Sequence, residues 1–559
     1  MNRYNHIWVV AVFFYQGLLG QISHSVLGTP PVDGNEPSIS FDPNNSKYGI
    51  VGFNTNQLYI TLDGGKAWSP ILLDPPQGFY GDPVIKTAKN GSIFLAHLAH
   101  NKTANWPDFF DRIVFERSDD HGKTFSSSDV GFRQGKMQDK PWFEIDEWPK
   151  SKGNGNIYLS WTEFDKYGSV ASSDSSRIWF AKSSDEGRTF EKPVIVSDVS
   201  GDSKDGDATA EGANISVSQD GVLHAVWSRN DTIWYDRSLD FGLTWGSDRC
   251  IAVQHGGWSH EDLLGTMRSN GMPFIMADRF DNLRVVYSSG ACAKQLSTDC
   301  QERNIYAIKG NARTGIFEEP QKINNDVGLT EQYSPMIAAN PNKSRIFVVW
   351  YDRRRSATGY FYDLYGAELG NSGRYSLQNT AHDTRNIRLT ATSSLAPGNA
   401  IFMGDYIGLD WKKNIHIAYT GFDVLEQHPT IQFVCIDLKK KPRKILGHLG
   451  IEHPDLIVNT IENTAIKSST IDPDSSNSSL KEIAIWAAWP GATSFTLEFK
   501  LGKQIVFEHV FENLKDSKVD FCLPASRFSP GVYEIILRMK GKKVKQGFYL
   551  HKIEKEYRK

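Results

Sequence analysis

The chain has few cysteines and no excess of charge. Five cysteines are spread over 559 residues, and 62 lysine and arginine side chains face 65 aspartate and glutamate side chains. This near-neutral balance gives no electrostatic reason to expect nucleic acid as a partner. No apolar run beyond the N-terminus is long enough to cross a bilayer, so we expect no membrane span in the mature chain.

Several catalytic motifs are absent as well. The sequence contains no His-Glu-x-x-His, no paired cysteine motif with zinc spacing, no P-loop and no Gly-x-Ser-x-Gly. The histidines at 97, 100, 255 and 260 are scattered without the spacing of metal ligands, which favours surface or core roles. The sequence therefore identifies no certain cofactor.

The cysteines offer one local pair. Cys292 and Cys300 flank a short polar loop and could form a disulfide there, whereas Cys250, Cys435 and Cys522 lie far apart in the sequence. Pairing cannot be deduced from spacing alone, so the last three are left unpaired.

Residues 1–25 have the pattern of a secretory signal peptide. Arg3 supplies the positive charge, residues 7–20 are mostly apolar, and small residues suited to cleavage occur at 23–25 or, alternatively, at Gly20. The pattern predicts a secreted or cell-surface protein. An uncleaved segment that anchors the chain is the alternative.

A phrase of eight residues occurs four times in the first half of the chain. It reads Ser/Thr-x-Asp-x-Gly-x-Thr/Ala-Phe/Trp and occupies residues 61–68, 118–125, 183–190 and 238–245. Its Asp can accept hydrogen bonds from backbone N–H groups and close a turn, its Gly allows a positive φ, and its aromatic residue can anchor the turn to the sheet. Because each copy follows a strand-like run, the phrase predicts a hairpin connection.

These four copies resemble the Asp box, or BNR repeat, of sialidases and related β-propellers. In that family the box lies away from the catalytic centre. The resemblance therefore implies an architecture, a propeller, rather than an activity.

A longer repeat predicts the same architecture. Seven units open with a polar residue, often followed by proline, and continue into an apolar strand and a second strand. The openings are Glu36-Pro37, Asp82-Pro83, Lys140-Pro141, Gly212-Ala213, Met272-Pro273, Ser334-Pro335 and Asp405-Tyr406. Spacings of about 45 to 72 residues suit propeller blades with loop insertions.

The predicted fold is therefore all-β, a seven-bladed β-propeller over residues 29–445. Six blades, the number in sialidases, are the alternative. The last unit is short of a fourth strand, which the segment after the signal peptide could supply. A polar, serine-rich linker over 446–479 is expected to lead to a small C-terminal β-sandwich over 480–552. The end of that domain, with the sequence SPGVY at 529–533 and KVKQGF at 543–548, resembles C-terminal sorting domains of Bacteroidetes secreted proteins, and a plain accessory domain is the other interpretation.

Polar residues at the starts of the seven inner strands form the predicted site. If all starts face one end of the channel, their acids form a ring able to hold a sugar, a cation such as calcium, or a cationic ligand. The candidate catalytic residues are Asp82, Asp139, Glu211, Tyr333, Asp405 and Tyr406. The alternative is that acids before strands only satisfy local turns.

Two further pairs are candidate substrate-binding residues. Lys140 and Trp142 place a cation and a large aromatic at one strand start, and Arg353 and Arg354 follow another strand. Guanidinium groups bind carboxylates through two hydrogen bonds, as recognition of sialic acid would need. Neighbouring side chains of a strand point to opposite faces, so adjacent arginines cannot all serve one ligand.

Comparison with sialidase motifs argues against sialic acid as the substrate. The resemblance implies an arginine in a Phe/Tyr-Arg-Ile-Pro motif before the first Asp box, but no arginine occurs between Arg3 and Arg112. One arm of the carboxylate clamp is missing, which argues against sialic acid.

The leading hypothesis is an exported propeller that acts on a glycan or glycoconjugate, as a glycoside hydrolase using carboxylates at the channel mouth. The alternative is a non-catalytic propeller that binds glycan or protein at the cell surface. A lyase on a propeller is a third interpretation.

Overall fold

The computed structural model forms two compact units, residues 1–443 and 444–559, which we describe separately. The described residues are 15–17, 20–27, 34–106, 108–260, 266–290, 303–326, 330–340, 345–354, 361–369, 387–388, 393–394, 402–422, 429–437, 455–462, 480–488, 494–501, 504–511, 518–524, 531–539 and 542–550. Cys292 and Cys300, the predicted disulfide pair, lie outside them. The described residues include no helix long and apolar enough to cross a bilayer.

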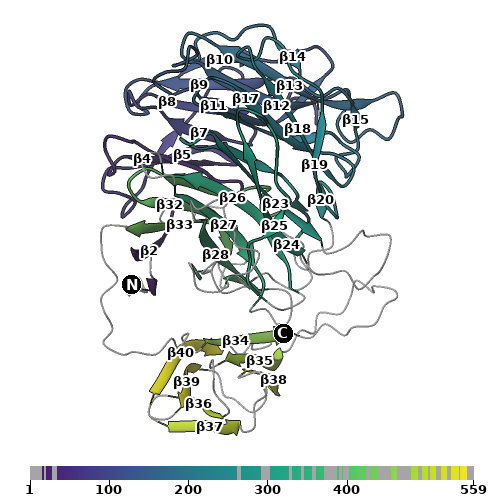
Figure 1. The fold of residues 1–559 in the computed structure, drawn as a ribbon. Helices are drawn as coiled ribbons and strands as arrows, with labels where there is room; N and C mark the ends of the chain where they lie inside the picture. Colours follow the sequence, from purple (N-terminus) through teal and green to yellow (C-terminus); the bar gives the residue numbers. More distant parts are fainter. Residues whose placement is uncertain are drawn as a thin grey trace, which may run out of the picture. The chain divides into compact units, whose positions relative to one another are not determined.

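The first unit is a propeller of seven antiparallel sheets (Figure 1). Its first strands are β3 (Ser38–Phe41), β7 (Val84–Thr87), β11 (Met137–Ile145), β16 (Glu211–Val217), β22 (Phe274–Ala277), β26 (Gln332–Ala339) and β31 (Gly408–Trp411). Each begins within about three residues of one of the seven predicted openings. The seven-bladed prediction is confirmed, and the six-bladed alternative is wrong.

The other strands follow in chain order within each blade. The second strands are β4 (Gly49–Phe53), β8 (Ile93–Leu98), β12 (Ile157–Phe164), β17 (Leu223–Ser228), β23 (Asn282–Gly290), β27 (Ile346–Asp352) and β32 (Ile415–Phe422). The third strands are β5 (Thr55–Thr61), β9 (Ile113–Ser118), β13 (Ser175–Ser183), β18 (Thr232–Ser238), β24 (Arg303–Asn311), β28 (Phe361–Leu369) and β33 (Pro429–Asp437). The fourth strands are β6 (Ser69–Leu72), β10 (Ser126–Val130), β14 (Val194–Ile195), β19 (Arg249–Val253), β25 (Gln321–Lys322), β29 (Ile387–Arg388) and β2 (Gly20–Val26).

The first strands surround a central channel. A cavity of about 170 Å³ is lined by residues from all seven of them. The second strands β8, β12 and β17 are buried at every position, because each sheet is covered on both faces by neighbouring blades. Hydrogen bonds also join the blades: Ser38 Oγ accepts one from the Ile85 N–H, and Asp410 Oδ2 accepts one from the Phe41 N–H.

Both ends of the propeller chain complete the seventh blade. Strand β2 pairs with β33 in an antiparallel register from Gln21–Asp437 to Val26–Gln432, and the Leu27 N–H donates to the Ile431 carbonyl at 2.9 Å. The predicted closure by the N-terminal segment is therefore present in the structure. The closing strand lies earlier than expected, within residues 1–25, so only the cleavage alternative at Gly20 would keep it.

The four repeated phrases form turns between the third and fourth strands of blades one to four. In the turn at 183–190, Asp185 Oδ1 accepts hydrogen bonds from the Thr189 N–H and from the Ser183 hydroxyl, which itself accepts one from the Gly187 N–H. The other three turns repeat these contacts. The turn-closing role predicted for the Asp agrees with this geometry.

The aromatic residue of these turns packs against the preceding blade, although Trp68 also meets Phe41 of its own sheet, with ring centroids 6.3 Å apart. Phe190 meets Phe115 of β9 with ring centroids 5.0 Å apart, and Trp245 meets Phe180 of β13 at 5.2 Å. The fifth blade has no such phrase, yet Phe317 contacts Tyr235 of β18 in the same way, at 4.8 Å. The predicted anchoring of each turn is therefore an anchoring between blades.

The second unit contains two antiparallel sheets, the number that a sandwich needs. One has the order β34 (Asp455–Glu462), β35 (Leu480–Ala488), β38 (Lys518–Pro524). The other has the order β37 (Gln504–Phe511), β36 (Phe495–Leu501), β39 (Gly531–Met539), β40 (Lys542–Leu550). Strand β34 falls inside residues 446–479, where the sequence predicts a linker, so that prediction does not hold for residues 455–462.

Candidate functional site

Strand direction gathers the predicted site residues at one end of the channel. The first strand of every blade starts there, and because the sheets are antiparallel, the second strands end there as well. We call this end the mouth. The seven strand openings, and the loops that follow the second strands, therefore share the mouth.

An uncommon backbone conformation aims three of the opening side chains toward one another. Glu36, Asp82 and Lys140 have φ values of 53°, 54° and 48°, and each directly precedes a proline. Such left-handed, non-glycine positions cost about 1–3 kcal/mol each and persist only where the surroundings hold them. One such contact is visible at Asp82, whose N–H donates to Asn54 Oδ1 at 2.8 Å.

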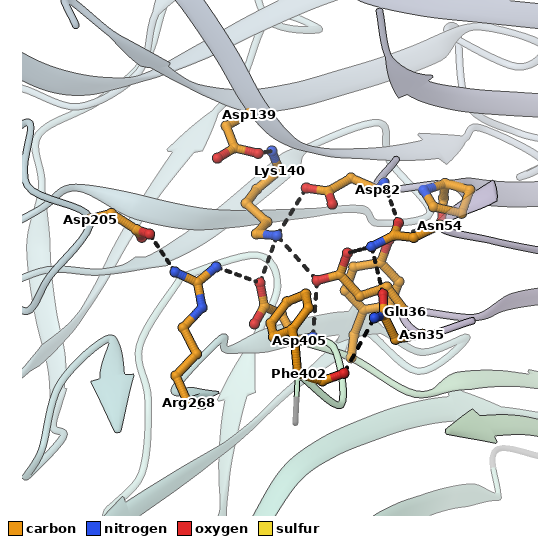
Figure 2. Close-up of polar contacts among 12 residues, drawn as sticks. Asn35, Glu36, Asn54, Asp82, Asp139, Lys140, Asp205, Arg268, Phe402 and Asp405 are labelled. Carbon is orange, nitrogen blue, oxygen red and sulfur yellow. Dashed lines mark hydrogen bonds and ion pairs between the residues drawn. The ribbon is translucent and has the colours of Figure 1, made fainter. Parts of the chain in front are cut away.

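Lys140 is the centre of the resulting cluster (Figure 2). Its Nζ lies 2.6 Å from Asp405 Oδ2, 2.9 Å from Asp82 Oδ2 and 3.2 Å from Glu36 Oε1. The Lys140 side chain is only 5% exposed, and the three carboxylates are buried too. A buried ammonium with three carboxylates is stable only because the charges offset one another's loss of hydration.

A second cation extends this cluster. Arg268 forms an ion pair with Asp205, and its Nη2 lies 3.4 Å from Asp405 Oδ2. The Arg268 guanidinium also lies over the Phe402 ring, 5.4 Å from its centroid. Asp205 in turn accepts hydrogen bonds from the Tyr167 hydroxyl and from Trp258 Nε1. Asp405 therefore lies between the two cations, as Figure 2 shows.

Burial raises the pKa of the carboxyl groups in this region. It raises the pKa of Asp405 to about 6, although Lys140 and Arg268 act in the opposite direction. Burial likewise raises the pKa of Glu36, Asp82 and Asp139.

Glu211 is a further buried carboxyl group of this region. Burial, together with the charges of Asp205 and Asp139, raises its pKa well above the usual value. Neither oxygen of this fully buried carboxyl has a hydrogen-bond partner in the described part of the chain. These surroundings favour the protonated, uncharged form of Glu211.

The ammonium of Lys140 follows the opposite logic. Burial alone would lower its pKa, but Asp405, Asp82 and Glu36 raise it well above the usual value. Lys140 thus stays charged, and it lies where a cation held by the acidic ring would have to lie. Among the described residues no group of three or more His, Cys, Asp or Glu side chains forms a metal site. Calcium binding stays an untested prediction.

The two predicted tyrosines are buried. The Tyr406 hydroxyl donates to the Pro83 carbonyl at 3.2 Å, and burial raises its pKa well above the usual value. The Tyr333 hydroxyl lies 3.6 Å from Met403 Sδ, and the Arg353 guanidinium lies over its ring at 5.3 Å. In the described part of the chain, no carboxylate accepts a hydrogen bond from either hydroxyl, so neither has the partner that a tyrosine nucleophile needs.

Lys140 and Trp142 lie on the same strand, β11, but their side chains lie in different parts of the channel. The register between β11 and β12 shifts between Asp139 and Trp142, which marks a bulge. Trp142 lines the channel cavity, where its ring meets those of Phe274 and Tyr406 at 5.0 and 5.8 Å. Lys140 instead joins the carboxylates at the mouth.

The two predicted arginines also lie apart, and both come just after β27 rather than within it. Arg354 donates to Asp352 through Nε at 2.8 Å and Nη2 at 2.6 Å, and it lies over the Tyr365 ring. Arg353 is buried, with Nη1 4.0 Å from Glu331 Oε2. Arg354 is thus engaged in an internal ion pair, whereas Arg353 belongs with Tyr333.

Sequence reasoning missed Asp205, Arg268, Asn54 and Tyr167. None of them belongs to the repeated openings or phrases, and each lies in or beside a loop at the mouth. The only sequence signal was the position of Arg268 shortly before the opening at Met272.

Comparisons with known proteins give the following. No protein-family model matches the sequence, and no curated protein matches it. Solved structures that resemble the chain include the NanB sialidase of Streptococcus pneumoniae, at 10% identity and a TM-score of 0.39 over 70% of this chain and 84% of that one. The GH93 α-L-arabinofuranosidase of Fusarium graminearum has 15% identity and a TM-score of 0.42 over 66% and 96%. YCF48 bound to D1 peptide has 12% identity and a TM-score of 0.39 over 77% and 99%. At these scores the likenesses say nothing about the chemistry of this chain.

Proposed function

We propose that this protein is a glycan-acting propeller that hydrolyses glycosidic bonds at the mouth of its channel. The observation that carries the proposal is the gathering of carboxyl groups around Lys140, with Asp405 poised to titrate near pH 6. Glycoside hydrolysis needs one carboxyl group that gives a proton and one carboxylate close to it. The cluster supplies both types of group.

Asp405 is the proposed proton donor and Asp82 the proposed carboxylate partner. Oxygens of both lie within 3 Å of the same Lys140 nitrogen, so the two carboxyl groups are close together. This proximity favours the retaining mechanism, in which the groups are about 5–5.5 Å apart. Asp405 protonates the leaving oxygen while Asp82 attacks the anomeric carbon and the glycosidic bond breaks. Asp405 then takes a proton from a water molecule whose oxygen attacks the same carbon, which breaks the bond to Asp82 and releases the sugar. Because the carboxyls are buried, the mouth has to open to admit the substrate.

Export and family membership are parts of the same proposal. The N-terminal pattern supports secretion or display at the cell surface. The four Asp-box phrases support membership of the sialidase-like BNR family. Sialic acid is the least expected substrate, because no arginine lies between Arg3 and Arg112.

The burial of the carboxyl cluster favours a second function, glycan binding without hydrolysis. Asp405 is 0% exposed, and the ion pairs of Lys140 and Arg268 already satisfy much of the cluster. A propeller in which this cluster only rigidifies the mouth, while the surface binds a glycan, would look the same.

A hydrolysis screen on the full chain separates the two. We would test fluorogenic glycosides, including a sialoside, with and without calcium. We expect turnover that Asp405→Asn lowers by at least about 10²-fold. Asp129→Asn, at an ion pair with Arg112 on the surface, should leave turnover unchanged. Wild-type protein that binds glycans but cleaves none would establish the binding function instead, and full activity of Asp405→Asn would remove Asp405 from the mechanism.

A further inference from the structure

An aromatic cluster with an exposed tryptophan lies beside the carboxyl cluster at the mouth. Trp106 is in the loop between β8 and β9, which follows a second strand and so opens at the mouth. Its side chain is 56% exposed, and that of Tyr80, two residues before Asp82, is 40% exposed. Large aromatic side chains this exposed are candidates for ligand contact.

The Trp106 indole is held by other rings. Its centroid lies 5.4 Å from those of Phe109 and Phe110 and 5.8 Å from those of Tyr80 and Tyr167. Phe109 and Phe110 are buried beneath it. The tryptophan is therefore preorganised, so a ligand that stacks on its open surface would not have to order it first.

Hydrogen bonds and ion pairs connect this platform to the proposed site. Tyr167 touches Trp106 through its ring and donates its hydroxyl proton to Asp205. Asp205 pairs with Arg268, which pairs with Asp405. A ligand on Trp106 would thus lie next to, and not on, the carboxyl groups.

The surroundings favour an uncharged ligand. The exposed side chains of the Trp106 loop are one cation, one anion and neutral hydrogen-bonding groups, namely Lys102, Asp108, Thr103 and Asn105. A pyranose ring matches such a surface, because it presents a flat face of C–H groups for an aromatic ring and hydroxyl groups at its rim.

We propose that Trp106 and Tyr80 form a stacking subsite for a neutral sugar unit next to the one held at Asp405. This inference rests on the proposed glycan-directed function and sharpens it. The ligand would be an oligosaccharide of two or more units and not a single sugar.

The test measures binding and does not depend on turnover. Full-length wild type and the variants Trp106→Ala, Trp106→Phe and Phe280→Ala would be applied to an array of neutral and sialylated mono- to hexasaccharides. Phe280 is the matched control, since it is an exposed aromatic (59%) in the loop between β22 and β23, at the opposite end of the channel. We expect wild type and Phe280→Ala to bind oligosaccharides, and Trp106→Ala to bind them about tenfold more weakly.

Each outcome decides the inference. Equal binding by Trp106→Ala and wild type, or no preference of wild type for oligosaccharides over single sugars, would overturn it. Binding of tetramethylammonium in place of sugars would reveal a cation cage and overturn it too. If Trp106→Ala unfolds on heating before Phe280→Ala does, the smaller ring of Trp106→Phe takes its place and should still bind more weakly than the control. Trp106-dependent binding without hydrolysis would refute the proposed enzyme while supporting the platform.

Discussion

Lys140→Met is the most direct test of the carboxyl cluster. The substitution keeps an unbranched side chain but removes the ammonium that contacts Asp405, Asp82 and Glu36. The cluster then carries one more negative charge, and the simplest compensation is the uptake of one proton by a carboxyl group. The variant should therefore be destabilised by an amount that depends on pH.

The magnitude follows from the pKa of a carboxyl group in the unfolded chain, about 4. Keeping one carboxyl protonated costs about 1.4 kcal/mol for each pH unit above that value, or about 5 kcal/mol at pH 7.5 and about 1.4 kcal/mol at pH 5. The cost of about 5 kcal/mol at pH 7.5 agrees with the roughly 3–5 kcal/mol that removal of one partner of a buried ion pair typically costs.

The direction can be checked on Asp405. Burial raises its pKa to about 6 in the folded protein, above the value of about 4 in the unfolded chain. Its contribution to stability is complete below about pH 4 and is lost as the pH rises through 6. Lys140 lowers the pKa of Asp405, so its removal raises this pKa further. The loss of stability then continues to higher pH. Lys140→Met should thus be closest to wild type under acidic conditions.

The assay is urea unfolding at pH 7.5 and pH 5, followed by the fluorescence of buried tryptophans such as Trp161 and Trp227. Lys86→Met is the matched control, because Lys86 pairs with Glu144 at 2.8 Å on the next-door strands, with both side chains more than a quarter exposed. We expect it to lose less than about 1 kcal/mol at either pH. Equal losses of Lys140→Met at the two pH values, or a loss below about 1 kcal/mol at pH 7.5, would refute the reasoning.

Two further predictions concern the fold. Gly242 has a φ of 87°, and a Cβ there would lie 2.1 Å from the Phe180 ring, so Gly242→Ala should cost more than about 3 kcal/mol in urea unfolding. Gly155 is the control, because its φ is 91° and the space around it is open, so Gly155→Ala should cost about 1 kcal/mol. Similar losses would show that the turn does not press on the preceding blade. A chain that begins at residue 27 lacks β2 and exposes the edge of β33, so its Tm should lie several degrees below that of a chain that begins at Gly20. Equal Tm values would mean that β2 does not close the ring.

The repeating parts of the fold were predictable from sequence for a physical reason. Each first strand is preceded by a polar residue, which is often followed by a proline, and continues as a run of apolar residues. Burial on both faces requires this pattern in every blade. The sequence alone therefore places the openings at Glu36, Asp82, Lys140 and Asp405 at one end of the channel. Their position at one end follows from strand direction, whereas the contacts among their side chains do not.

The remaining parts depend on details that a pattern does not carry. The positive φ of Lys140 and the bulge after Asp139 turn the lysine to the mouth and Trp142 into the channel, although simple alternation would place the two on one face. Arg268 and Asp205 come from loops whose course no periodicity describes. Strand β2 was hidden because a short strand and the end of a signal peptide share a similar composition.

The pairing of β2 with β33 has a consequence for biosynthesis. The two partners stand at opposite ends of the propeller chain, so the seventh sheet cannot be completed until nearly the whole propeller has left the ribosome. Until then β33 has no partner at its outer edge, and blades one to six form an open arc. Long-range pairing of this kind is slow and leaves edges exposed to wrong partners. Late closure would suit the proposed export, because no finished ring can form until β33 has been made.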